Sequence, residues 1–390
     1  MKKPTVILTY PQSFGPPHGG GKVHCARLAR ALEQLGTKVL ILTTARPNSD
    51  ATQELAVPAF RVSASRVHYL LDGLPMAKTV KAILAQEDVA AVIGWDHEAT
   101  FLPSLLRRKG VVFGMIGAAP FYRSTDGIYG AGSWSPKNLA SRWFRQRPVR
   151  LADVVFTASQ FTRCELIAAG VAKERIVCAP LGVDETIRQI PRRFGGRITR
   201  LIFFGPLVPA KGILDVLEAL GKLAASGKRD WKLKIAGWGD ESLVWKTAQQ
   251  FAIQDLIAVL GSLDRPALVR ELEWAQLAIL PSHVESFGLA IAEAQAAGLP
   301  VIAYRAGAVP EIVEDGSTGW LIPAGRTDLL STAVGEAMES SERSFVMGLT
   351  GRKRMDCHFS WERSAAVVMT SIAKLSTLRK ITPNIGGSGQ

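Results

Sequence analysis

Two glutamates separated by seven residues, Glu285 and Glu293, carry the strongest chemical pattern in this chain of 390 residues. Glu285 lies in a polar loop after the apolar segment 277–280, and Glu293 lies inside the alanine-rich segment 289–297, whose composition predicts a helix. Carboxylates accept hydrogen bonds from sugar hydroxyls, so one glutamate is able to hold a sugar while the other holds a ribose. The alternative is a capping loop followed by a solvated helical glutamate.

The elements around these glutamates predict an anion site. A strand, a glycine-bearing loop and a helix place exposed N–H groups and the positive end of the helix dipole at the carboxyl edge of a sheet. Ligands of open α/β sheets bind at this edge. We therefore expect a phosphate between the two carboxylates, at the amides of Phe287, Gly288 and Leu289, next to Ser286.

Strand–loop–helix units recur along the chain in two series, which predicts an α/β protein with parallel sheets. In the first series we expect strands at 6–9, 38–43, 90–94, 111–116 and 154–158, and helices at 22–35, 76–86 and 161–169. In the second series we expect strands at 201–205, 232–236, 277–280 and 301–303, and helices at 212–225 and 266–275. A last helix is expected at 361–378.

The segment 280–319 resembles the E-x7-E motif of the retaining GT-B glycosyltransferases of glycosyltransferase family 4. Their pattern is roughly P-S-x-x-E-x-F-G-x4-E-A-x-A-x-G-x-P-V, followed by E-x-V-x-D-G-x-x-G. The chain matches it with intact spacing at Pro281, Ser282, Glu285, Phe287, Gly288, Glu293, Ala294, Ala296, Gly298, Pro300, Val301, Glu311, Asp315, Gly316 and Gly319. The resemblance implies a GT-B fold, in which two Rossmann-like α/β domains face a central cleft.

The resemblance also implies a domain plan. We expect an N-terminal Rossmann-like, acceptor-binding domain at 1–185, an interdomain linker at 186–200, and a C-terminal Rossmann-like, nucleotide-sugar-binding domain at 201–360. The helix at 361–380 is expected to pack back on the N-terminal domain, and 381–390 is expected to be a disordered tail.

Other family features follow in the same order along the chain. Lys211 resembles the lysine that grips the donor diphosphate, whereas Pro206 replaces a family arginine, whose charge Lys22 is hypothesised to supply. Glu285 is expected at the transferred sugar and Glu293 at the ribose. The implied donor-binding residues are Gly19, Gly20, Gly205, Lys211, Gly237, Leu263, Glu285, Ser286, Phe287, Gly288, Leu289 and Glu293.

The acceptor side of the implied site is expected in the first domain. Asp96 and His97 follow the expected strand 90–94 and are our candidates for residues near the reacting carbon. An ordinary loop at a strand end is the alternative. His24 also matches a frequent family position, with a packed or capping histidine as its alternative.

The activity implied by the resemblance is hexosyl transfer, with retention, from a nucleotide-diphosphate sugar to an acceptor hydroxyl. The implied catalytic residues are Lys211, Glu285, Asp96 and His97, and the leaving phosphate itself takes the acceptor's proton. We expect no metal and no cofactor, because the scattered cysteines and acidic residues form no ligand motif and the UDP- or GDP-linked sugar is a co-substrate. The alternatives are a nucleotide-sugar epimerase of the same architecture and a non-catalytic sugar-nucleotide-binding subunit.

Charge is unevenly distributed along the chain. Residues 1–180 hold 23 Lys and Arg against 12 Asp and Glu, a net of +11, whereas residues 181–390 hold 24 against 22, a net of +2. A basic first half suggests an anionic partner, such as a membrane surface, a phosphorylated, glycan or lipid-linked acceptor, or a nucleic acid, and a solvated basic surface is the alternative. Trp143 among arginines suits a membrane interface, a lipid-linked acceptor or nucleic acid, and an ordinary amphipathic helix that docks its tryptophan inward is the alternative. Of these partners we expect no nucleic acid. No apolar run is long enough to span a membrane, so we expect a cytoplasmic protein, peripheral on the inner face of the membrane.

Overall fold

The computed structural model describes residues 4–11, 20–45, 59–63, 69–117 and 136–381. The chain divides into two compact units. Unit 1 comprises residues 1–180 together with 361–390, and unit 2 comprises residues 181–360. Unit 1 is therefore discontinuous in sequence, and the chain leaves it after Pro180 and returns to it at Trp361.

Unit 1 is built on a parallel sheet. Its strands, in the part of the chain that is described, pair in the order β3-β2-β1-β4-β5-β6-β7. They are β1 (Thr5–Tyr10), β2 (Lys38–Ala45), β3 (Ala59–Ser63), β4 (Val89–Gly94), β5 (Val112–Ile116), β6 (Val154–Thr157) and β7 (Ile176–Cys178). Every residue of β1 is buried, as expected for a parallel strand covered on both faces.

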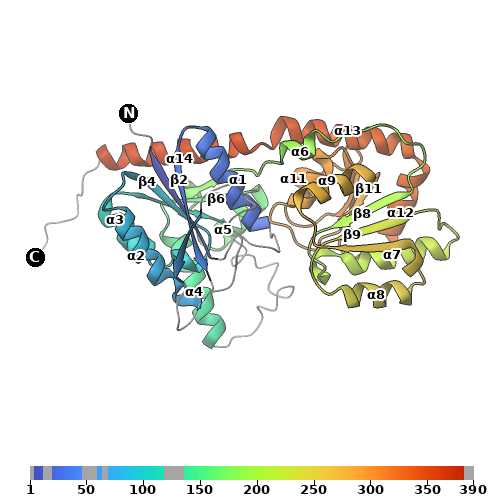
Figure 1. Ribbon diagram of the computed structural model, residues 1–390, viewed down its shortest axis with the longest axis horizontal. Helices are drawn as coiled ribbons and strands as arrows, with labels where there is room; N and C mark the ends of the chain where they lie inside the picture. Colours follow the sequence, from blue (N-terminus) through green and yellow to red (C-terminus); the bar gives the residue numbers. More distant parts are fainter. Residues whose placement is uncertain (1–3, 12–19, 46–58, 64–68, 118–135, 382–390) are drawn as a thin grey trace, which may run out of the picture. The chain divides into compact units, whose positions relative to one another are not determined.

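Helices cover the sheet of unit 1. Figure 1 shows α1 (Gly20–Gln34) and α14 (Trp361–Ile381) side by side, and these two helices pack against each other. Arg379 of α14 donates to Asp153, at 2.6 Å, and to the carbonyl of Val111. The remaining helical segments are η1 (Tyr69–Asp72), α2 (Gly73–Ile83), η2 (His97–Ala99), α3 (Leu102–Lys109), α4 (Pro136–Leu151), α5 (Gln160–Ala168) and η5 (Lys173–Arg175).

Unit 2 repeats the same arrangement. Its strands are all parallel and pair, among the described residues, in the order β10-β9-β8-β11-β12-β13. They are β8 (Arg200–Phe204), β9 (Lys232–Ala236), β10 (Ile257–Gly261), β11 (Leu277–Ile279), β12 (Val301–Tyr304) and β13 (Gly319–Ile322). In both sheets the first strand of the unit lies in the interior and the order reverses beside it, as in a Rossmann fold.

The helices of unit 2 lie on both faces of its sheet. In Figure 1, α7 (Ile213–Ala225) and α8 (Glu241–Gln250) lie below the strands and α13 (Ser341–His358) lies above them. Other helical segments are α6 (Glu185–Arg188), η6 (Pro209–Lys211), η7 (Gln254–Leu256), α9 (Arg265–Trp274), α10 (Leu289–Ala296), α11 (Val309–Ile312) and α12 (Thr327–Glu339).

Residues 186–200, predicted to form a link, pack within unit 2 instead of spanning two bodies. The guanidinium of Arg192 donates to the carbonyls of Ala275, at 2.8 Å, and Ala297, at 2.5 Å, where α9 and α10 end. Carbonyls at helix ends have no partner within their helix, so this arginine caps two helices at once. Arg192 therefore has a structural role that the basic composition of the segment did not indicate.

Candidate active site at the strand ends of the two units

The residues predicted to bind the donor lie at the point where the strand order of unit 2 reverses. Lys211 follows β8, and Glu285 follows β11, which is the neighbour of β8 in the sheet. Parallel neighbours present their carboxyl ends at one edge, and connections that leave in opposite directions open a crevice there. The topology therefore explains why segments about 70 residues apart in sequence meet.

Lys211 and Glu285 form an ion pair. The Nζ atom of Lys211 lies 2.7 Å from Oε1 of Glu285, and their side chains are 22% and 14% exposed. The two loops are also joined through the backbone, because the His283 N–H donates to the carbonyl of Ala210 at 2.9 Å. An ammonium group has three donors, so Lys211 is able to contact an anionic oxygen while it still holds Glu285.

Two glycines allow the loops to approach this closely. Gly212 has a φ of +74°, and a Cβ atom there would lie 2.0 Å from the carbonyl oxygen of Pro281. Gly237, after β9, has a φ of +159°, and its Cβ would lie 1.8 Å from the carbonyl oxygen of Gly205. Only glycine fits such contacts at positions 212 and 237. Gly205, also a predicted donor residue, supplies the carbonyl that Gly237 approaches, and its own φ of +141° favours glycine.

The loop after β11 ends at the start of α10, as predicted. Gly288 is the N-cap of this helix with a φ of +98°, and Leu289 is its first residue. The side chain of Phe287 is buried and packs edge-on against Phe359, 5.7 Å away, so only its backbone is able to serve a ligand. The amides of residues 287–289 therefore form the N-terminus of a helix of eight residues, where anions are stabilised.

Glu293 is not the solvated helical glutamate of the alternative interpretation. It is 6% exposed, and its Oε1 lies 2.7 Å from Nη1 of Arg265, the first residue of α9. The same guanidinium donates through Nε to Oδ2 of Asp184, at 2.6 Å, and also through Nη2. Burial lowers the pKa of Arg265, but the charges of Glu293 and Asp184 outweigh it and hold this pKa above its usual range.

The remaining predicted donor residues are distributed around this edge or fall outside the description. Leu263 lies half-buried between β10 and α9, two residues before Arg265. Ser286 is half-buried in the loop beside Glu285. In unit 1, Gly20 is exposed at the start of α1, whereas Gly19 lies outside the described residues.

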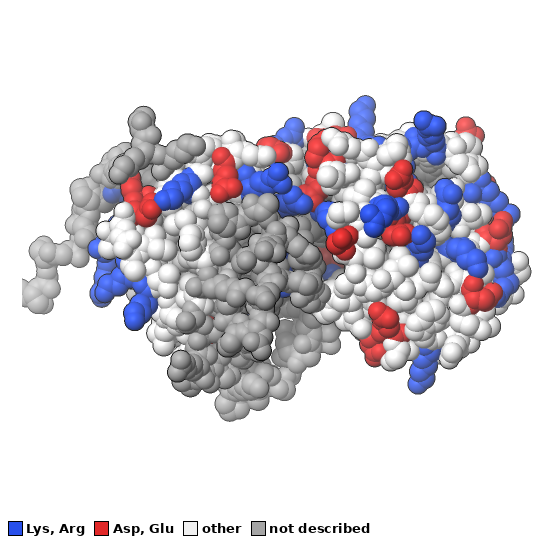
Figure 2. Space-filling view, viewed as in Figure 1, with Lys and Arg blue, Asp and Glu red and all other residues white. Residues whose placement is uncertain are grey.

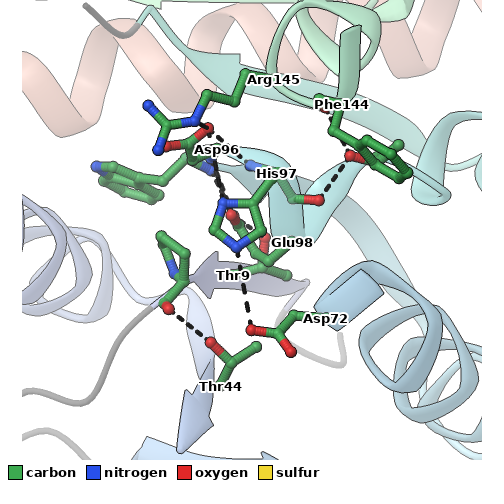
Figure 3. A network of polar contacts seen from close by, with 11 residues as sticks. Thr9, Thr44, Asp72, Asp96, His97, Glu98, Phe144 and Arg145 are labelled. Carbon is green, nitrogen blue, oxygen red and sulfur yellow. Dashed lines mark hydrogen bonds and ion pairs between the residues drawn. The ribbon is translucent and has the colours of Figure 1, made fainter. Parts of the chain in front are cut away.

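Asp96 and His97, the predicted acceptor-side residues, follow β4 at the reversal point of unit 1. Figure 3 shows the imidazole of His97 between two carboxylates, with Nδ1 3.9 Å from Asp96 and Nε2 4.0 Å from Asp72. Asp96 accepts from the backbone N–H of His97 at 2.8 Å and lies 3.5 Å from Nε of Arg145. Burial lowers the pKa of His97, but its contact with Asp96 and the charge of Glu98 more than offset this and raise it.

Glu98 anchors the backbone of the Asp96–His97 loop through hydrogen bonds. Its carboxyl group is completely buried and accepts from the hydroxyl of Thr9, at 3.0 Å, and from the backbone N–H groups of Trp95, at 2.8 Å, and Asp96, at 3.0 Å (Figure 3). Burial and the nearby charge of Asp96 raise the pKa of Glu98 to about 7. The backbone donors lower this pKa but do not cancel the effect of burial.

His24 and Lys22 of α1 are buried, which favours a packing role for the histidine. The imidazole of His24 packs 5.4 Å from the ring of Trp95 and 5.8 Å from that of Trp361, and burial lowers its pKa to about 4. The Lys22 side chain is 8% exposed, and burial lowers its pKa.

Several polar residues of these edges were not predicted from the sequence. Unit 2 contributes the Asp184–Arg265 contact and a second cluster in which Asp215 lies 3.0 Å from Nε2 of His283 and accepts from the Tyr304 hydroxyl at 2.6 Å. Glu98, directly after Asp96 and His97, was not among the predicted site residues.

Comparisons with known proteins agree with this architecture. Residues 18–186 match the model of Glycosyltransferase Family 4, and residues 184–354 match that of Glycosyl transferases group 1. A sucrose-phosphate synthase from Thermosynechococcus elongatus superimposes with a TM-score of 0.79 at 19% identity, over 96% of this chain and all of that one. The fold is GT-B, which confirms the fold class predicted from the sequence.

Two curated relatives are mycobacterial mannosyltransferases. An MMP alpha-(1->4)-mannosyltransferase of Mycolicibacterium hassiacum is 30% identical over 63% of this chain and 61% of its own length. A GDP-mannose-dependent alpha-(1-6)-phosphatidylinositol monomannoside mannosyltransferase of Mycobacterium tuberculosis is 25% identical over 92% of this chain and 96% of its own. The two family models match in order along residues 18–354, and both relatives are glycosyltransferases by name, so each half of the chain is similar to glycosyltransferases.

Proposed function

We propose that this protein is a retaining glycosyltransferase that moves a hexose from a nucleoside-diphosphate sugar to an acceptor hydroxyl. The observation that carries the proposal is the Lys211–Glu285 pair, which stands at the switch point of unit 2 beside the N-terminus of α10. A cation, a row of helix-end amides and a sugar-binding carboxylate at one sheet edge suit a diphosphate attached to a sugar.

The proposed chemistry follows from the charges at this edge. When the glycosidic bond to the diphosphate breaks, negative charge grows on the leaving phosphate and positive charge grows on the sugar ring. Lys211 and the amides of residues 287–289 are fixed donors that stabilise the first charge. Glu285 holds the sugar hydroxyls. Retention follows if the acceptor attacks the face that the diphosphate leaves, with that phosphate taking the acceptor's proton.

The name of one relative indicates which sugar donor to test first. One of them is GDP-mannose-dependent by name, so GDP-mannose is the first donor to test, with UDP-sugars next. We propose that Glu293 binds the ribose and that Pro206, where the family carries arginine, leaves Lys211 as the main cation for the diphosphate. We further propose that no metal takes part; among the described residues, no group of three or more His, Cys, Asp or Glu side chains is arranged so that it could hold a metal ion.

The acceptor is proposed to be a glycan or a lipid-linked sugar, bound in unit 1 near Asp96 and His97. One relative acts on phosphatidylinositol monomannoside by name.

Within the described residues no helix is long and apolar enough to cross a bilayer. Peripheral attachment to the inner face of an anionic membrane is proposed through α4, where Trp143 is 52% exposed and the guanidinium of Arg147 lies 5.6 Å from its ring. On the face of unit 2 in Figure 2, by contrast, basic and acidic side chains are intermixed.

The test begins with thermal stabilisation of the purified protein by GDP-mannose and by UDP- and ADP-sugars, followed by transfer assays. We expect Glu285→Ala to abolish transfer and Glu293→Ala to weaken donor binding, whereas Glu336→Ala, an exposed glutamate of α12, leaves both unchanged. If neither site variant weakens binding or transfer, the site assignment is wrong.

Two further outcomes would support the alternatives. Interconversion of two nucleotide sugars without any acceptor indicates an epimerase. Tight donor binding without hydrolysis or transfer indicates a non-catalytic binding subunit. Activity that is lost in EDTA and restored by a divalent cation would contradict the proposed independence from metal.

A further inference from the structure

Three separate elements of unit 2 meet at one guanidinium. Arg265 begins α9, directly after the loop that follows β10; Glu293 comes from α10; and Asp184 is the N-cap of α6. Nη1 of Arg265 lies 2.7 Å from Oε1 of Glu293, while Nε lies 2.6 Å from Oδ2 of Asp184. The Glu293 and Asp184 side chains are 8% and 6% exposed, so the chain of charges Asp184–Arg265–Glu293 is largely withdrawn from water.

A buried carboxylate keeps its charge only if it is paired. Without Arg265, burial would favour a protonated Glu293, which accepts hydrogen bonds poorly and is free to choose another rotamer. With Arg265, the Nε and Nη2 donors of the planar guanidinium group contact Asp184, and its Nη1 donor contacts Glu293. The orientation of Glu293 is thus linked to that of Asp184 through the arginine.

We propose that Arg265 is a positioning residue for the nucleotide: anchored on Asp184, it keeps Glu293 ionised and oriented to accept hydrogen bonds from the ribose hydroxyls. The inference rests on the proposed function, in which Glu293 binds the ribose. It adds a residue outside the matched motif, and it gives a partner of opposite charge to a buried glutamate in a helix whose other residues, apart from Gln295, are apolar.

Arginine is required at this position by geometry. Lysine has the charge but only one nitrogen, which would have to choose between the two carboxylates, whereas the guanidinium reaches both from one plane. Arg265→Lys therefore preserves the local charge and removes the simultaneous contact. Asp184→Asn leaves arginine and glutamate in place and weakens the anchor.

The experiment removes the proposed contact from both sides, once in the protein and once in the ligand. Calorimetry measures the Kd of GDP and UDP, and of their 2′-deoxy and 3′-deoxy counterparts, for the wild-type protein and for Arg265→Lys and Asp184→Asn. In the wild type we expect loss of a ribose hydroxyl to weaken binding about tenfold, as expected for a hydrogen bond to a charged group. In Arg265→Lys the same loss is expected to cost less than about threefold, and in Asp184→Asn an intermediate factor.

The matched control is Lys234→Gln. Lys234 forms an ion pair of 2.5 Å with Glu271, which also lies on α9, and these side chains are 26% and 21% exposed. This variant loses a partly buried ion pair in the same unit and should keep the full wild-type preference for ribose over deoxyribose. In transfer assays Arg265→Lys should raise the KM for the donor sugar and leave kcat within about twofold, because the contact is made equally in the ground state and the transition state.

The outcomes separate the inference from the function on which it rests. Equal hydroxyl preference in the wild type and in Arg265→Lys overturns the inference and leaves the glycosyltransferase assignment standing. Absence of any hydroxyl preference in the wild type also overturns it, since Glu293 then does not contact the ribose. If neither GDP nor UDP binds the wild type, the proposed function fails and the inference fails with it.

Discussion

Glu98 makes the stability of unit 1 depend on pH in a predictable direction. Its carboxyl group is fully buried beneath the Asp96–His97 loop, where burial raises its pKa from 4.5 to about 7. The folded protein therefore binds a proton at Glu98 more tightly than the unfolded chain does. Stability contributed by this proton is present at low pH and is lost as the pH rises through 7.

The size of the effect follows from the two pKa values. With 4.5 for the unfolded chain and about 7 for the folded one, the free energy of unfolding should fall by about 2.5 kcal/mol between about pH 5 and about pH 8. Four neighbours share this environment: Tyr10 of β1, Cys25 of α1, and Asp96 and His97 of the loop. Their own titration is removed by comparison with a variant that differs only at Glu98.

That variant is Glu98→Gln, which is neutral at every pH. Urea unfolding of both proteins is followed by hydrogen exchange of peptides from β1 and β4, so that the signal reports unit 1. The difference in unfolding free energy, wild type minus variant, should decrease by about 2.5 kcal/mol from about pH 5 to about pH 8. A difference that stays constant, or increases with pH, would refute the argument that burial controls this carboxyl group.

Three further substitutions test the ion pair of Lys211, the close approach at Gly212 and the contacts of Arg379. Lys211→Met should lower kcat for sugar transfer about a hundredfold or more in initial-rate assays, with Arg326→Met of an exposed pair as control; an unchanged kcat would exclude Lys211 from the chemistry. Gly212→Ala should destabilise unit 2 by at least about 2 kcal/mol in urea, because its Cβ meets a backbone carbonyl, whereas Gly227→Ala, with a φ of +88° and open space around it, should show only the smaller cost of strain. Equal effects of the two alanines would contradict this close approach. Arg379→Ala should lower the unfolding free energy of unit 1 by about 1 kcal/mol, measured by the same exchange method, and a loss confined to unit 2 would show that the assigned contacts are wrong.

The fold could be predicted largely because its strands are buried on both faces. Apolar runs such as 201–204, between Arg200 and Gly205, are bounded by glycine and polar residues, so the sequence predicts their type and order. The sequence did not predict β3 (Ala59–Ser63) and β7 (Ile176–Cys178), because these short strands lie at the edges of their sheet and lack a long apolar run. The helix α13 (Ser341–His358) was missed because polar residues dominate it and its packing is set by tertiary contacts.

The candidate site could be predicted only where local sequence implies local geometry. The loop before α10, with Glu285 and Gly288, has a pattern that specifies its own backbone. Partners that come from distant segments have no such signal. Nothing in the sequence around Arg265 indicates that its guanidinium reaches Asp184, 81 residues away. The pairing depends on how three helices pack, which is a property of the folded unit.

The return of α14 to unit 1 has a consequence for how the protein is made on the ribosome. Unit 2 is one continuous stretch and is complete when residue 360 leaves the exit tunnel. The sheet of unit 1 is synthesised first but lacks the helix that packs on α1 until residues 361–381 emerge. During that interval the nascent sheet presents apolar surface that α14 later covers. We therefore expect the first-made unit to reach its native state only after unit 2 has been synthesised, and holding chaperones to associate with it until α14 has emerged.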